Sequence, residues 1–157
     1  MTLTELIWLS VACYAFHAFE EFTLNWRDWA RAVIKLPVEW PDFYVVNFVV
    51  VVLGIVAAEL AASQPMIALA FPALMLINAI IFHIAQVVRM RGRFSPGVIT
   101  AVILFLPVGT ACFMRAAADG VLDAKTALGA FVIAALLMAS PIVFLNIRGK
   151  PYFRQDL

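Results

Sequence analysis

Five long apolar segments account for most of this chain and restrict it to one class of structure. They cover residues 3–24, 42–62, 65–88, 96–118 and 125–147. A helix needs about 20 mainly apolar residues to cross a bilayer, and each segment reaches that length. Backbone groups in lipid must be paired within the protein, and the segments are continuously apolar rather than alternating, which favours helices over a β-barrel. The sequence therefore predicts an all-α integral membrane bundle of five transmembrane helices.

The composition agrees with a single membrane domain. Hydrophobic residues make up 65% of the chain and charged residues 13%, whereas a soluble domain is about half apolar and about a quarter charged. With 157 residues the chain is too short for a second domain, so we expect one transmembrane helical domain over residues 1–157. The net charge of +1, with basic residues in short clusters, gives no indication of nucleic-acid binding.

A short amphipathic stretch, residues 25–36, follows the first apolar segment. Its apolar side chains recur at helical spacing, and Arg27, Arg31 and Lys35 form a separate basic stripe. This pattern is typical of a short helix that lies in the membrane interface. We therefore expect an interfacial helix between the first two transmembrane helices, with a simple extension of the first helix as the alternative.

The basic residues fall mainly on one side of the predicted bundle. Of the eleven Lys and Arg residues, three lie in the 25–36 stretch, three in the loop after the third segment, and three in the C-terminal tail (Arg148, Lys150 and Arg154). Only Arg115 and Lys125 fall on the other side. Because cytoplasmic loops are enriched in Lys and Arg, we expect the N-terminus outside and the C-terminus in the cytoplasm.

The first apolar segment ends in a cluster of ionisable residues, His17, Glu20 and Glu21. A charge inside a membrane helix costs about 2.5–3.5 kcal/mol even on insertion scales, so such residues usually mark functional sites. Positions i, i+3 and i+4 share one face of a helix. The spacing therefore predicts that all three side chains can point at one spot.

A second histidine lies at a matching depth on the third segment. His83 precedes Arg89 by six residues, which places it about 9 Å inside the boundary at about 1.5 Å per residue. Asn78 lies nearer the midplane on the same segment. The other segments also bring polar residues to this half of the bundle, namely Asn47, Gln86, Ser95 and Asn146. The sequence predicts one polar cavity in the cytoplasmic half.

The first interpretation of this cavity is a metal site. Imidazole and carboxylate suit Zn²⁺ or non-haem Fe²⁺, and a catalytic site keeps one position open for water or substrate. His17, His83 and either Glu20 or Glu21 would bind one divalent metal ion. The remaining glutamate would act as the acid or base, and Asn78 would orient a ligand. A di-iron bundle site takes more carboxylates than this chain has at that depth.

Two metal-free interpretations compete with the metal site. Two neighbouring carboxylates in a poorly solvated cavity cannot easily both ionise, so one keeps a proton and forms an acid–base pair with the other glutamate or with a histidine. Such a pair could isomerise, cyclise or hydrolyse a lipid-soluble substrate. The other interpretation is a non-enzymatic lipid-binding or transport module, in which the polar residues hold the bundle together or relay protons or ions.

The start of the fourth segment also carries a recognisable pattern. Ser95-Pro96 predicts a helix with Ser95 as the N-cap and Pro96 at the first helical position. The free N–H groups of that helix start could face an anionic group such as a phosphate headgroup. A plain helix start is the alternative.

Residues 17–21, His-Ala-Phe-Glu-Glu, resemble the signature of the HXXEE domain family of small bacterial integral membrane proteins. Further similar stretches are residues 78–83, residues 93–100 with Pro96-Gly97, and Pro107. The resemblance spans most of the chain, and the family is defined by its motif rather than by an established activity. It implies a bacterial inner-membrane location and a joint role for seven residues: His17, Glu20, Glu21, Asn78, His83, Pro96 and Gly97.

We therefore expect a membrane-embedded enzyme that acts from the cytoplasmic half on a lipid or other hydrophobic substrate. A metal-dependent hydrolase or oxidoreductase fits the residue types best. The expected partners are membrane lipid and a lipid-like small molecule, and the apolar flanks of a five-helix bundle are suited to a homodimer.

Overall fold

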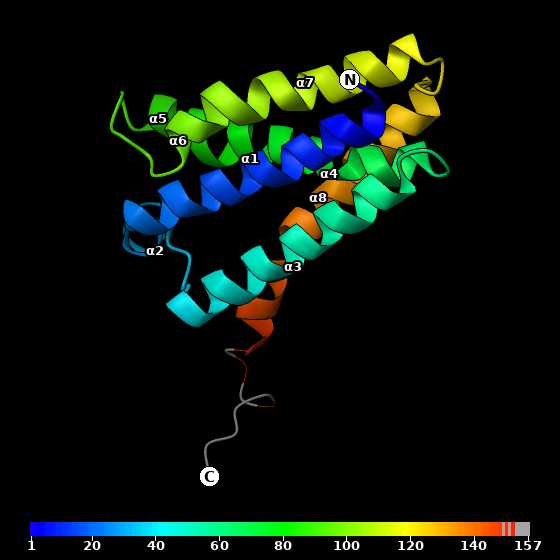
Figure 1. Ribbon diagram of the computed structural model, residues 1–157. Coiled ribbons are helices and arrows are strands. Elements are labelled where there is room, and N and C mark those ends of the chain that lie inside the picture. The colour runs from blue at the N-terminus through cyan, green and yellow to red at the C-terminus, as the bar shows by residue number, and fades with distance from the viewer. Residues whose placement is uncertain (149, 151, 153–157) are drawn as a thin grey trace.

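Each predicted apolar segment forms a helix in the computed structural model, which describes residues 1–148, 150 and 152 (Figure 1). No strand occurs in that part of the chain. In chain order the elements are α1 (Leu3–Thr23), α2 (Trp26–Trp29), the π-helix η1 (Ala30–Ile34), α3 (Trp40–Leu60), α4 (Pro65–Ile77), the π-helix η2 (Asn78–Ile84), α5 (Ala85–Arg89), α6 (Val98–Thr100), the π-helix η3 (Ala101–Phe105), α7 (Leu106–Ala118) and α8 (Ala124–Arg148).

Four helical stretches are long and apolar enough to cross a membrane. They are Trp40–Leu60, Pro65–Arg89, Val98–Ala118 and Ala124–Arg148, the second and third of which each contain a π-helical segment. The helix α1 also has 21 residues, but it carries three carboxylates and does not meet the same criterion. Four of the five predicted spans are thus supported by length and composition, and a fifth span by α1 stays a prediction.

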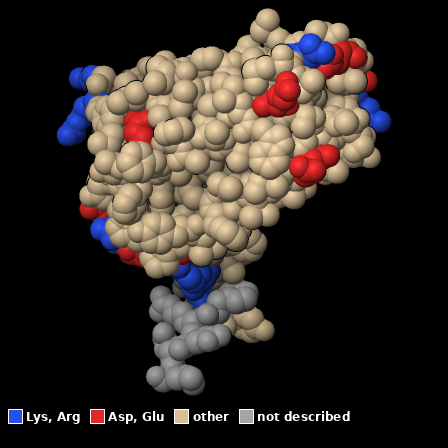
Figure 2. All heavy atoms as spheres, in the orientation of Figure 1, with Lys and Arg blue, Asp and Glu red and all other residues tan. Residues whose placement is uncertain are grey.

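The distribution of charge on the surface fits a multi-pass membrane protein. On the face that Figure 2 shows, charged side chains gather toward the two ends of the bundle, and a broad uncharged band lies between them. A short helix, α2 with η1, occupies the predicted place between α1 and α3, while its position at a membrane interface stays a prediction. Arg154 of the predicted basic tail lies outside the described residues.

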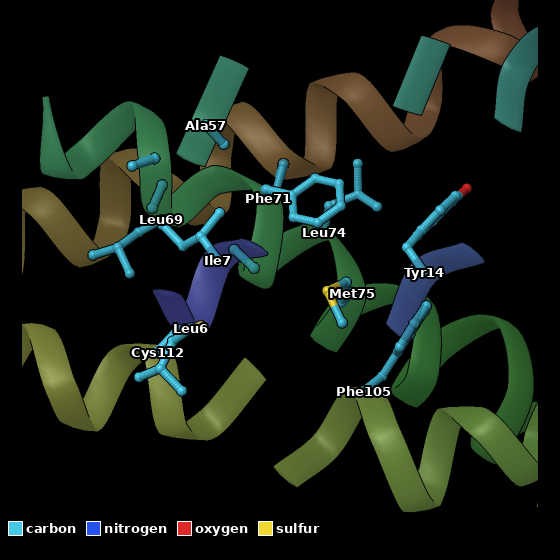
Figure 3. Packing of buried hydrophobic residues seen from close by; sticks show 14 of the residues in the cluster. Leu6, Ile7, Tyr14, Ala57, Leu69, Phe71, Leu74, Met75, Phe105 and Cys112 are labelled. Atoms are coloured by element: carbon cyan, nitrogen blue, oxygen red, sulfur yellow. The ribbon is translucent and has the colours of Figure 1, made fainter. Parts of the chain in front are cut away.

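The helix α1 packs against α3, α4 and α7 with one face buried. The buried positions of that face recur every three or four residues, as expected for a helix that covers a core: Leu3, Leu6, Ile7, Ser10, Cys13, Tyr14, His17 and Glu21. Figure 3 shows Ile7 beside the core of α4, and Tyr14 stacks on Phe105 with ring centroids 5.9 Å apart. The apolar face of α1 therefore continues directly into His17 and Glu21.

The C-terminal end of α1 lies beside the start of the α6–η3–α7 helix, with α2 and α5 at the same end of the bundle (Figure 1). This helix begins at Val98, two residues later than the sequence predicts. Gly97 occupies the N-cap position with a φ angle of 95°, and Ser95 makes no capping bond. The predicted Ser95 cap is therefore wrong, because the chain turns at Gly97, where a positive φ angle is tolerated.

Candidate metal centre

Three buried ionisable side chains from distant parts of the chain converge at this end of the bundle. Nε2 of His17 and Nε2 of His83 each lie 3.5 Å from the same atom, Oε1 of Glu21. The exposed fractions are 1% for His17, 0% for His83 and 6% for Glu21. One ligand atom from each residue lies within 4.8 Å of the other two. The three residues form the His–Glu–His cluster named in the rest of the text.

The two nitrogen–oxygen separations in the cluster are close to those between ligands of a tetrahedral metal ion. In a tetrahedral site with metal–ligand distances of about 2.0–2.1 Å, neighbouring ligand atoms lie about 3.3–3.4 Å apart. The observed 3.5 Å is close to this separation. Both Nε2 atoms are buried and have no hydrogen-bond partner within the described residues. Such atoms are costly in a protein interior unless they bind something, so the donor set suits a cation.

His83 reaches the cluster from a π-helical segment, η2. Single π-helical turns frequently occur at functional sites, because the extra residue per turn changes the direction of a side chain. The two imidazole rings stand edge to face, with centroids 4.8 Å apart. On its other side, Nδ1 of His83 lies 3.3 Å from Oγ of Ser95.

Glu20 turns away from the cluster and binds the start of the α6–η3–α7 helix. Oε1 accepts hydrogen bonds from the N–H groups of Gly97 (3.0 Å) and Ile99 (3.2 Å). Oε2 accepts from the N–H (2.7 Å) and the hydroxyl (2.6 Å) of Thr100. The anion at this helix start is thus Glu20 itself, where sequence reasoning considered a phosphate headgroup. A helix N-terminus stabilises a negative charge at this place.

Gly97 lies against both imidazole rings. A Cβ atom at this position would overlap Cε1 of His83 and would lie 2.8 Å from Cε1 of His17. A side chain is therefore excluded by space as well as by the positive φ angle. Only glycine fits at this position, where the loop before α6 packs against the two imidazole rings.

The cluster borders a cavity of about 640 Å³. Most of its walls are apolar side chains of α3 and α8, with α4 and η2 contributing Leu74, Asn78 and Phe82. Glu21 is part of the lining, so the cluster and the cavity share this carboxylate. Asn78 also lines the cavity, and its Oδ1 atom is buried without a partner within the described residues. Tyr14 lines it as well, and its hydroxyl donates to Oδ1 of Asn47 at 2.9 Å. An ion pair between Asp42 and Arg148 also lines the cavity.

Of the predicted site residues, the structure brings together His17, Glu21 and His83. Asn78 stands on the cavity wall and Glu20 on the neighbouring helix start. Sequence reasoning missed Thr100 and Tyr14. Thr100 stands three residues after Gly97, inside the stretch that resembles the family, and this position is the signal that could have found it. Tyr14 precedes His17 by one helical turn on the same face.

One protein family matches this chain. A family model described as "Protein of unknown function with HXXEE motif" matches residues 8–112. The matched range includes the whole His–Glu–His cluster, Glu20 and the start of the α6–η3–α7 helix. No curated protein and no solved structure matches the chain.

Proposed function

We propose that this chain, which belongs to the family of proteins with the HXXEE motif, is a membrane-embedded, metal-dependent enzyme that acts on a lipid or other hydrophobic substrate. One observation carries the proposal: two buried histidine Nε2 atoms without hydrogen-bond partners face the same carboxylate oxygen, each at 3.5 Å. No hydrogen bond within the described residues satisfies these nitrogens, and a metal ion would satisfy both at once.

Two histidines and one glutamate form a donor set known for two metals. In zinc enzymes such a set holds Zn²⁺ with a fourth position for water, and in non-haem iron enzymes two histidines and a carboxylate hold Fe²⁺ with open positions. The bound ion would polarise a substrate carbonyl or activate a water molecule. The donor set therefore supports a hydrolase with Zn²⁺ or an oxidoreductase with Fe²⁺.

The cavity supports a hydrophobic substrate. Its walls are mainly apolar, and its volume of about 640 Å³ is in the range of small-molecule sites, about 300–1,000 Å³. Glu21 belongs to both the cluster and the cavity lining, so a substrate in the cavity would lie beside the ion. Asn78 and Tyr14, which also line the cavity, would bind polar atoms of that substrate.

The metal-free acid–base interpretation has less support. A pair of the two glutamates would have to share a proton, whereas the two oxygens of Glu20 accept four hydrogen bonds from the α6 helix start. Glu21 faces the two histidines, so an acid–base pair here would consist of Glu21 and a histidine. We favour the metal because one ion would satisfy both Nε2 atoms at once.

Elemental analysis of the purified protein tests the proposal. Protein prepared in detergent without chelator should contain about one equivalent of zinc or iron, and His83→Ala should lose it. Asn146→Ala, a polar substitution on α8 away from the cluster, is the matched control and should retain the metal. A wild-type content below about a tenth of an equivalent, after addition of Zn²⁺ or Fe²⁺ and removal of the excess, would overturn the proposed metal dependence.

A further inference from the structure

We infer that the two glutamates of the motif have separate tasks: Glu21 is a ligand, and Glu20 is a positioning residue that sets the tautomer of His17 through the hydroxyl of Thr100. The inference deepens the proposed function, and its consequence for metal binding rests on that function. Its central claim concerns the position of a proton and can be measured without a metal.

The hydroxyl of Thr100 links Glu20 to His17. Oγ1 of Thr100 lies 2.6 Å from Oε2 of Glu20 and 2.8 Å from Nδ1 of His17. A hydroxyl has one proton to donate, and its oxygen can accept others. Both oxygens of Glu20 already accept backbone N–H groups, from Gly97, Ile99 and Thr100. The carboxylate is therefore the acceptor, and Thr100 donates its proton to Oε2.

The direction of this bond decides the protonation of His17. Because the hydroxyl proton points to Glu20, the contact with Nδ1 of His17 is a hydrogen bond only if Nδ1 carries a proton and donates it. In the neutral ring, Nε2 is then the unprotonated nitrogen. The second acceptor near the hydroxyl, the carbonyl of Gly97 at 3.3 Å, leads to the same result, since a carbonyl also only accepts.

His83 has a different partner on its other ring nitrogen. Its Nδ1 atom lies 3.3 Å from Oγ of Ser95, a hydroxyl that can donate or accept. The tautomer set by the hydrogen bonds is therefore that of His17, whose unprotonated Nε2 faces Oε1 of Glu21. An unprotonated imidazole nitrogen beside a carboxylate oxygen is suited to bind a cation.

Nuclear magnetic resonance can test the tautomer directly, because the chain has only two histidines. The full-length protein, labelled with ¹⁵N-histidine and kept in detergent with a chelator, is measured at a pH where both rings are neutral. We expect the Nδ1–H tautomer for His17, whose signals are assigned by comparison with His83→Ala. A wild-type His17 protonated on Nε2 would overturn the inference. This result is independent of the proposed function, which fails separately if the wild type binds no metal.

Variants of Thr100 test the link from Glu20 to His17. Thr100→Val removes the hydroxyl at nearly constant volume and should shift His17 toward the other tautomer. It should also weaken binding of Zn²⁺, measured by chelator competition, about 10–100-fold, as expected for loss of a partner behind a ligand. Thr100→Ser keeps the hydroxyl and should retain both properties. Thr110→Val, at an exposed threonine of α7, is the matched control and should change neither.

Glu20→Gln completes the test. An amide can donate to the hydroxyl oxygen of Thr100, so the hydroxyl proton is free to turn toward Nδ1 of His17. We expect a mixed tautomer and weaker Zn²⁺ binding, with a far-ultraviolet circular dichroism spectrum like that of the wild type. Wild-type tautomer populations in both Thr100→Val and Glu20→Gln would contradict the positioning role of Glu20. If either variant fails to fold, the wild-type measurement still decides the tautomer of His17.

Discussion

The backbone of Gly97 lies so close to His83 that a methyl group at position 97 would overlap the Cε1 atom of the imidazole ring. Gly97 also has a φ angle of 95°, which side chains rarely tolerate. The loop before α6 and the imidazole ring therefore occupy adjoining space, and the position of the ring depends on the absence of a side chain.

This contact predicts that Gly97→Ala displaces His83 and weakens metal binding. The positive φ angle alone should cost about 1–3 kcal/mol of folding free energy, and the overlap should reduce the affinity for Zn²⁺ further. Gly92→Ala is the matched control, because Gly92 has a φ angle of 87° and a methyl group added to it would have no neighbour within 4 Å. It should show the strain in thermal unfolding but bind Zn²⁺ normally. Equal Zn²⁺ affinity in the two variants would contradict the predicted displacement.

Glu21→Gln should abolish the metal site. The amide oxygen is a far weaker ligand than a carboxylate, and the amide nitrogen cannot bind a cation, so we expect the metal content measured by elemental analysis to fall to background. Glu59→Gln, at an exposed position of α3, makes the same chemical change away from the cluster and should keep the wild-type content. Retention of the metal in Glu21→Gln would remove Glu21 from the set of ligands.

Filling the cavity should separate substrate binding from metal binding. Val46 lines the cavity from α3, and Val46→Trp would occupy much of the space that we assign to a hydrophobic chain. We expect less bound lipid in native mass spectrometry and an unchanged zinc or iron content. Val52→Trp, on an exposed part of the same helix, should retain the lipid. Unchanged lipid in Val46→Trp would show that the cavity is not the lipid site.

The fifth span can be tested by labelling from outside the cell. The N-terminus and the loop before α6 lie at opposite ends of α1 (Figure 1), so a spanning α1 would place them on opposite sides of the membrane. The native Cys13 and Cys112 are buried and should react slowly. In intact cells we expect a membrane-impermeant maleimide to label Thr2→Cys, and to label Arg93→Cys only after permeabilisation. Labelling of both on the same side would rule out the spanning helix.

The positions of the helices follow from local sequence. Each apolar segment is about the length of a bilayer span, and the boundaries lie where prolines, glycines and charges interrupt the apolar run. The start of α3 at Trp40 and the end of α8 at Arg148 are within two residues of the predicted limits. The exception is the start of the fourth segment. The free N–H groups at that start donate to Glu20 of α1, a contact between distant residues that no local pattern contains.

The site, like the helices, was predicted in part from the sequence and decided in part by the tertiary structure. The spacing of His17, Glu20 and Glu21, together with the depth of His83, predicted from sequence alone a polar cluster at one end of the bundle. Their residue types also indicated a metal. The spacing could not say which glutamate joins the histidines, because positions i+3 and i+4 lie on either side of the line through position i along a helix. The tertiary structure decided it. Glu21 lies on the buried face of α1, beside His83. The N–H groups at the start of the α6–η3–α7 helix donate to Glu20.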